Sequence, residues 1–260
     1  MIPKLVYSIL CAVLFYGTII AETPTNQTPE QKYDFAKDEY TKLTSHSAVI
    51  SSDAGIGREL KDEISTVPKL IKLRQFSEAE LILDQVISKF SELMSDKRKF
   101  YVAVRLDSEY KEHLHFIRKQ QKKEVIRVHI SFADALQLKG YIAIEEKQWE
   151  KAIKFFETET FYAPYEVGAL SEKGHVMIKL GKLEEAITLY EKAYAIALVR
   201  KNDIYESALA LRGIGCALID MGRLDEAIVV YEKSLKIEPG NPLALHELQY
   251  IRDKKEEGFK

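Results

Sequence analysis

The sequence predicts a mainly α-helical fold: a solenoid of stacked helix–turn–helix units with a small strand–helix–strand insert and a C-terminal capping helix. Nearly the same stretch occurs three times, as WEKAIKFFETETFYAPYE from residue 149, LEEAITLYEKAYAIALVR from residue 183 and LDEAIVVYEKSLKIEPGN from residue 224. Apolar residues inside each copy recur at helical spacing. Residues 100–106 and 125–132 instead alternate between apolar and polar with period two, which is typical of strands.

Composition and charge narrow the class of protein. The 260 residues are 46% hydrophobic and 30% charged, which is enough for a buried core. The net charge of −2 comes from 38 basic and 40 acidic residues that are well mixed along the chain. Because nucleic-acid binding usually needs a basic patch, we expect no nucleic-acid partner.

The N-terminal segment has the pattern of a secretory signal peptide over residues 1–21. A charge-free apolar run, residues 5–20, follows a single Lys and ends at Ala21 before a polar stretch. Ile19 is bulky for a cleavage site, so retention of the run as an N-terminal anchor stays open, as does a buried soluble helix. Signal peptide and anchor both predict an extracytoplasmic, periplasmic location, with membrane contact only through this run if it is uncleaved.

Cysteine usage means that the fold must rest on packing. Cys11 lies inside the apolar run, so Cys216 is the only cysteine of the mature chain and no intramolecular disulfide can form.

The chain before the repeats divides into three parts. Residues 22–57 are rich in Thr, Gln, Pro and Lys and predict a linker. Residues 58–95 contain RQFSEAELILDQVISKF, which we interpret as a degenerate copy of the helical repeat. Residues 96–132 hold both alternating stretches with a helical pattern between them, so we predict a strand–helix–strand insert there; a continuous helical pair is the alternative.

Three repeat units follow, at residues 133–166, 167–200 and 208–241. The first two are in register at 34 residues, and the third is displaced by 41, which corresponds to an insertion of seven residues. Each unit has a Gly in its first helical pattern and an Ala-x-x-x-aromatic sequence in its second. The recurring residues are Gly140, Ala152, Phe156 and Pro164, then Gly174, Ala186 and Tyr190, then Gly215, Ala227, Tyr231 and Pro239.

This pattern resembles the tetratricopeptide repeat, a helix–turn–helix of 34 residues. The small residues stand where two helices cross, and the aromatic fills the gap to the next unit. Ala143, Met177 and Leu218 replace the usual Tyr of the first helix, and Leu198 replaces one Pro. The lost Pro and the added residues occur together, so we expect two longer helices at that point. Residues 242–260 then form an amphipathic capping helix, with Asn241 as its cap.

The resemblance implies a concave groove that is lined by the first helices and binds a protein or peptide. The side chains expected in it are Asp134, Gln137, Tyr141 and Glu145, then Ser171, His175 and Lys179, then Arg212, Cys216 and Asp220. Some family members clamp a partner's C-terminal carboxylate with Lys and Asn at these places. Gln137 and Tyr141 stand there in this chain, so that activity is not carried over.

We therefore predict a non-enzymatic binding scaffold that acts outside the cytoplasm; a self-associating structural protein of the cell envelope is the alternative. The sequence contains no nucleophile elbow, metal-ligand spacing or nucleotide loop, so we expect no enzyme activity, cofactor or metal. A thiol pair of His175 and Cys216 is a weaker enzymatic alternative. The partner's identity and the oligomeric state are left open.

Overall fold

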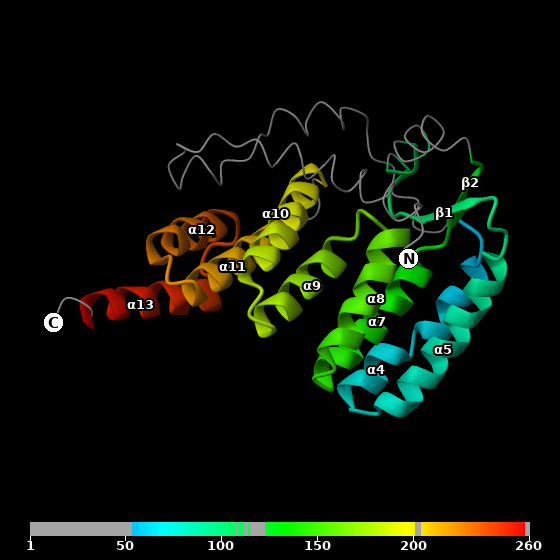
Figure 1. The fold of residues 1–260 in the computed structure, drawn as a ribbon, viewed down its shortest axis with the longest axis horizontal. Coiled ribbons are helices and arrows are strands. Elements are labelled where there is room, and N and C mark those ends of the chain that lie inside the picture. Colours follow the sequence, from blue (N-terminus) through cyan, green and yellow to red (C-terminus); the bar gives the residue numbers. More distant parts are fainter. Residues whose placement is uncertain (1–53, 108, 112–113, 115–122, 201–203, 258–260) are drawn as a thin grey trace, which may run out of the picture.

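The helices lie side by side in one row, from α4 and α5 at one end to α13 at the other (Figure 1). The structure, a computed structural model, describes residues 54–107, 109–111, 114, 123–200 and 204–257. The elements are η1 (Arg58–Ile64), α4 (Val67–Lys72), α5 (Phe76–Leu93), β1 (Phe100–Ala103), β2 (Val125–Val128), α7 (Ser131–Glu145), α8 (Trp149–Tyr162), α9 (Val167–Lys179), α10 (Leu183–Val199), α11 (Ile204–Asp220), α12 (Leu224–Ile237) and α13 (Pro242–Glu257).

The predicted fold class is confirmed. The three helix pairs α7–α8, α9–α10 and α11–α12 form the repeat units, and a small sheet is present beside them. In each unit the glycine of the first helix receives the aromatic ring of the second, so closely that a Cβ would overlap the ring. These contacts, given as the distance from that Cβ to the nearest ring carbon, are Gly140 to Phe156 (2.5 Å), Gly174 to Tyr190 (2.9 Å) and Gly215 to Tyr231 (2.5 Å).

One turn geometry joins the two helices of every unit, and it also joins α4 to α5. Its central residue has a left-handed backbone: φ is 57° at Lys147, 72° at Gly181, 75° at Gly222 and 58° at Arg74. The following N–H then donates to a carbonyl five residues earlier, which satisfies the end of the first helix. These bonds run from Gln148 to Ala143, Lys182 to Met177, Arg223 to Leu218 and Gln75 to Leu70. The α4–α5 pair therefore shares the backbone of the repeat, with its first helix split into η1 and α4.

Proline decides where the second helices end. α8 stops at Tyr162 and α12 at Ile237, each two residues before a Pro. α10 has Leu198 instead and continues to Val199. Both α10 and α11 have 17 residues, whereas α9 has 13 and α12 has 14. The added residues therefore lengthen both helices, as the missing Pro predicts.

The insert contains two parallel strands, with Phe100 paired to Val125 and Ala103 to Val128. They are shorter than the alternating sequence predicts, because the chain leaves the sheet after Ala103 and α7 already begins at Ser131. Residues 54–57 also differ from the expected linker. The N–H of Ile56 donates to the Arg127 carbonyl, and the Ile56 carbonyl accepts from the His129 N–H, so this segment runs along β2.

The last helix, α13, packs on α12 through Ala244, Leu248 and Ile251. Asn241 Oδ1 accepts a bond from the Ala244 N–H at 3.1 Å, which caps the helix. The predicted signal peptide or anchor, residues 1–21, lies outside the described residues. Within the described ranges, no helix combines the length and the hydropathy needed to cross a membrane.

Candidate partner-binding surface

The first helices of successive units lie next to one another and form a continuous surface. α9 contacts both α7 and α11. Gln137 of α7 packs on α9, where its Nε2 would be 2.3 Å from a Cβ on Gly168. Lys179 of α9 lies close enough to Cys216 of α11 to affect its titration. We call the outward-facing side chains of these three helices the first-helix surface.

Equivalent positions of the three units place Tyr141, His175 and Cys216 on this surface. The Tyr141 side chain is 40% exposed, Cys216 is exposed and His175 is half-buried. Lys179 is exposed one turn beyond His175, and Asp220 is exposed one turn beyond Cys216. The surface therefore mixes a ring, a thiol and charges of both signs.

Ser171 and Arg212 depart from the expectation of open groove side chains. Ser171 is buried, so its hydroxyl lies below the surface. Arg212 Nη1 donates to Glu238 Oε2 at 2.6 Å, and the Arg212 side chain is largely buried. Its guanidinium is therefore already neutralised by a carboxylate from the end of its own unit.

At the other end of the surface, the expected groove residues contact the parts of the chain that precede the repeats. Glu145 forms an ion pair with Arg74, in the α4–α5 turn, at 3.1 Å. Asp134 Oδ1 accepts from Arg105 Nη2 of the insert at 2.7 Å. The first unit thus uses two of its groove carboxylates to hold neighbouring segments of its own chain.

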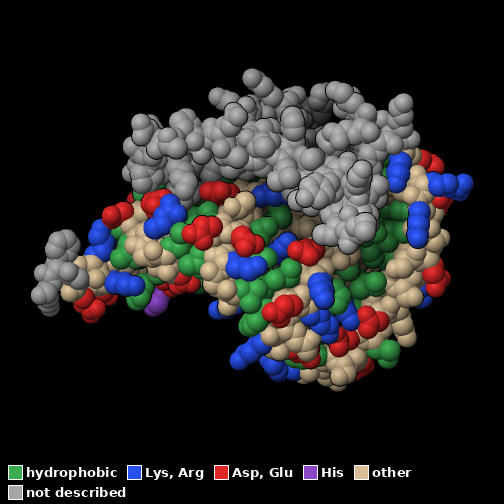
Figure 2. Space-filling view, viewed as in Figure 1, with side chains coloured by type: hydrophobic (Ala, Val, Ile, Leu, Met, Phe, Trp, Pro, Cys, Tyr) green, Lys and Arg blue, Asp and Glu red, His purple; other side chains and the backbone are tan. Residues whose placement is uncertain are grey.

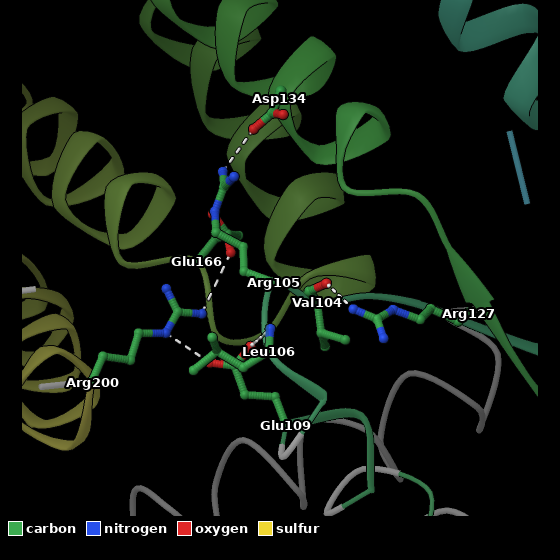
Figure 3. A network of polar contacts seen from close by, with 8 residues as sticks. All are labelled: Val104, Arg105, Leu106, Glu109, Arg127, Asp134, Glu166 and Arg200. Carbon is green, nitrogen blue, oxygen red and sulfur yellow. Dashed lines mark hydrogen bonds and ion pairs between the residues drawn. The ribbon is translucent and has the colours of Figure 1, made fainter. Parts of the chain in front are cut away.

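Arg105 belongs to a network that joins the insert to two repeat units (Figure 3). Besides Asp134, it binds Glu166, at the start of α9, through Nε at 2.8 Å. Arg200, at the end of α10, donates through Nε to Glu109 of the insert at 2.7 Å, and its Nη2 lies 3.5 Å from Glu166 Oε1. Glu166 thus lies between two guanidinium groups, one from the insert and one from the second unit.

The network is largely buried, which strengthens its electrostatic interactions. Burial raises the pKa of Glu109, and Arg200 opposes this rise. Burial disfavours the charge of Arg105, but Glu166 and Asp134 together raise its pKa well above the usual range. Each arginine therefore has carboxylate partners that balance its charge in this network.

The insert has internal contacts that present Arg105 and Glu109 to the repeats. Arg127 forms an ion pair with Asp107, and its Nη2 donates to the Val104 carbonyl at 3.1 Å. Tyr110 donates its hydroxyl to the Val125 carbonyl at 3.1 Å. These bonds fix the chain just after β1, where the network begins.

A known protein family matches two of the three units in sequence. The model of the tetratricopeptide repeat family matches residues 165–238, which span the second and third units. The second and third units are therefore similar in sequence to this family. No curated protein matches the chain in sequence.

Solved structures that resemble the chain include tetratricopeptide repeat proteins. One is the first tetratricopeptide repeat domain of Spaghetti (RPAP3), bound to an HSP90 peptide. It is 25% identical in sequence, the match covers 47% of this chain and 91% of that domain, and the TM-score is 0.42. The Sgt2 domain from Aspergillus fumigatus is 25% identical, covers 48% and 80%, and has a TM-score of 0.43. YrrB, described as having an unusual peptide-binding site, is 15% identical, covers 82% and 98%, and has a TM-score of 0.40.

Glu159 is a buried residue that sequence reasoning missed. It is 1% exposed on α8, and no donor in the described part of the chain bonds to its Oε2. Burial, together with Glu166 and Asp134, raises the pKa of Glu159 to about 9. The other two units have the small residues Ala193 and Ser234 at this position. A charged residue at a position that is otherwise small could have marked Glu159 from the sequence alone.

Proposed function

We propose that the chain is a non-enzymatic scaffold that binds a protein or peptide through the first-helix surface and acts outside the cytoplasm. Tetratricopeptide repeats are typically binding modules without catalytic activity, and the family match covers two units of this chain. The RPAP3 domain mentioned above holds a peptide, but its likeness to this chain is too distant to assign the same ligand.

The observation that carries the proposal is the row of exposed side chains on adjacent first helices. Tyr141, Lys179 and Cys216 lie at the surface of α7, α9 and α11. The core of the solenoid is instead filled by other positions of the same helices, such as Ile142, Val176 and Ala217. A rigid ring with a polar tip, beside a charged side chain, is typical of residues that anchor a protein partner.

The electrostatics of His175 and Cys216 support binding over catalysis. A nucleophilic cysteine needs a depressed pKa. Partial burial of Cys216, with Asp220 and Glu247 nearby, instead raises the pKa of its thiol. Burial and the neighbouring Lys179 lower the pKa of His175, which disfavours the imidazolium that would stabilise a thiolate. Both shifts run against an activated thiol pair.

Site-specific photo-crosslinking in the source cells tests the binding surface. A photoreactive residue would be placed at Tyr141 or Lys179 in the full chain, and at the exposed Glu184 on the second helix α10 as the control. We expect defined crosslinked partners from the first two positions and none from Glu184. Partners crosslinked equally from Glu184 would rule out the first-helix surface, and crosslinks of the chain to itself would favour the self-associating structural protein.

Action outside the cytoplasm is supported by the sequence of residues 5–20, which are uncharged. A phosphatase reporter that is active only after export, fused after residue 60, should be active. A stable but inactive fusion would contradict export and leave the binding proposal intact.

A further inference from the structure

α13 continues the row of first helices as a fourth member. Its Leu243 and Tyr250 stand 34 residues after Leu209 and Cys216 of α11, which is the spacing of one unit. It packs on α12 through its own buried side, so the equivalent outward positions remain exposed. The first-helix surface therefore extends beyond the third unit and onto α13.

This C-terminal part of the surface is apolar. Leu209 is 43% exposed, Leu243 54% and Tyr250 43%. The first two units have Asp134 and Gly168 at the position of Leu209 and Leu243, so of these four helices only α11 and α13 have an apolar side chain at this position. Large apolar side chains gathered on one exposed face are typical of an interaction site.

The 34-residue spacing of the repeat places the outward side of α13 beside that of α11. Glu247 lies on the same side of α13 as Leu243 and Tyr250, four residues after one and three before the other. It interacts electrostatically with Cys216, which lies two turns after Leu209 on one side of α11. The six side chains Leu209, Cys216, Asp220, Leu243, Glu247 and Tyr250 therefore form one surface, which we call the C-terminal surface.

Asp220 and Glu247 supply the carboxylates of this surface, and three cations of α11 and α13 are engaged. Arg212 is paired with Glu238 at 2.6 Å. Lys255 is paired with Asp225 at 2.5 Å. Lys254 lies over the ring of Tyr250, 5.6 Å from its centroid, which shows that this ring accepts a cation. Asp220 and Glu247 raise the pKa of the Cys216 thiol, and Lys179 on α9 acts against them.

In the first unit, the position equivalent to Leu209 contacts the insert of the same chain. Asp134 there is bound by Arg105 of the insert at 2.7 Å. Tyr165, between the first two units, also packs on the apolar cluster of the insert. At the first unit, a partner segment would therefore meet a position that the insert of this protein already occupies. At α11 and α13 it would meet an open apolar surface.

We infer that the C-terminal surface binds an amphipathic segment of a partner protein, with an apolar side that covers Leu209, Leu243 and Tyr250 and with Lys or Arg placed against Asp220 and Glu247. This inference rests on the proposed function and gives the chemistry of its ligand. Apolar contact supplies the affinity, and the two carboxylates select a basic over an acidic segment.

Selection from a displayed library of random peptides against the full chain tests this. We expect enriched peptides with apolar residues at helical spacing flanked by Lys or Arg. A fluorescently labelled synthetic copy should bind at least about tenfold more weakly to Leu243→Asp and to Asp220→Lys. Glu184→Lys carries the same type of charge change on α10 and should bind as the unchanged chain does. A peptide with its Lys replaced by Glu should recover binding to Asp220→Lys.

Folding does not confound these variants, because Leu243 and Asp220 are exposed and their replacement should leave the melting temperature nearly unchanged. Enriched acidic peptides, or binding that Leu243→Asp and Asp220→Lys leave intact while Tyr141→Ala abolishes it, would overturn this inference and keep the proposed function. A library without any enriched peptide would count against both. A dimer in light scattering that Leu243→Asp dissociates would identify a second copy as the occupant and also overturn the inference.

Discussion

The ring of Tyr190 on α10 lies against Gly213 on α11, so closely that a Cβ on this glycine would be 2.3 Å from the ring carbon Cε1. The same ring lies against Gly174 of its own unit, where the corresponding distance is 2.9 Å. Tyr190 therefore fills the gap between the second and third units, and two glycines make room for it. Because the ring is buried on both sides, it cannot move away without disturbing both units.

Gly213→Ala should destabilise the chain although alanine favours helices. Overpacking a core costs about 1–3 kcal/mol, whereas the gain in helix propensity is about 1 kcal/mol, so we expect a net loss of up to about 2 kcal/mol in urea unfolding. Gly168→Ala is the matched control, since its Cβ would meet only the flexible end of Gln137. Equal free energies of unfolding for the two variants would show that the Tyr190 contact is not tightly packed.

The units could be predicted from the sequence because their contacts are local and repeated. Gly174 and Tyr190 lie in one unit, and the same pair recurs as Gly140 with Phe156, so a fixed spacing encodes a fixed contact. The lengthened α10 and α11 were also predictable, since the Pro that ends the other second helices is Leu198 here.

The network around Glu166 could not be predicted, because its members come from three distant segments. Arg105 and Arg200 both reach this carboxylate, yet Arg105 lies 61 residues before it and Arg200 lies at the far end of the next helix, α10. Repeat spacing says nothing about where an insert docks. The engagement of Arg212 with Glu238 was missed for a related reason, because groove positions were assigned from the first helices alone.

The left-handed turn residues give a second prediction. Lys147 has a φ of 57°, at the position where the next two units have Gly181 and Gly222. A left-handed backbone costs a residue with a side chain roughly 1 kcal/mol, while glycine adopts it freely. We expect Lys147→Gly to raise the free energy of unfolding by up to about 1 kcal/mol, measured by urea denaturation.

The reverse change, Gly181→Ala, supplies the control for this turn. No atom lies within 4 Å of the added Cβ, so only backbone strain can act. It should lower the free energy of unfolding by a similar amount, about 1 kcal/mol. A loss of stability in Lys147→Gly, or a gain in Gly181→Ala, would contradict the assigned turn.

Arg200 should be essential for docking the insert. Its side chain, and those of Glu109 and Glu166, are each less than a tenth exposed. Removing one partner of a buried ion pair leaves the other charge unpaired and costs about 3–5 kcal/mol. We therefore expect Arg200→Met to lower the free energy of unfolding by about 3 kcal/mol and to speed amide hydrogen exchange in β1 and β2.

An exposed ion pair provides the comparison for Arg200. Lys89 lies 2.7 Å from Glu63, and both side chains are at least a third exposed. Such pairs contribute about 1 kcal/mol or less, so Lys89→Met should have a small effect. If Arg200→Met cost no more than Lys89→Met and left exchange in the strands unchanged, the network would not hold the insert.

Glu159 should make the chain less stable as the pH rises. Its pKa of about 9 in the folded state is above the ordinary value of 4.5, because burial and the charges of Glu166 and Asp134 favour the neutral acid. Between these two values the folded state keeps the proton and the unfolded state releases it. Raising the pH therefore favours unfolding, by at most about 1.4 kcal/mol for each pH unit.

Glu159→Gln replaces the titratable carboxyl with a neutral amide and keeps the shape of the side chain. The variant should gain free energy of unfolding relative to the unchanged chain, and the gain should grow from about pH 5 to about pH 8, as measured by urea denaturation at several values across that range. Glu157→Gln makes the same substitution at an exposed position of the same helix and serves as the control. Parallel pH profiles for Glu159→Gln and the unchanged chain would show that Glu159 is already ionised in the folded state. In that case Arg105, which acts to lower the pKa of Glu159, must be stabilising its charge.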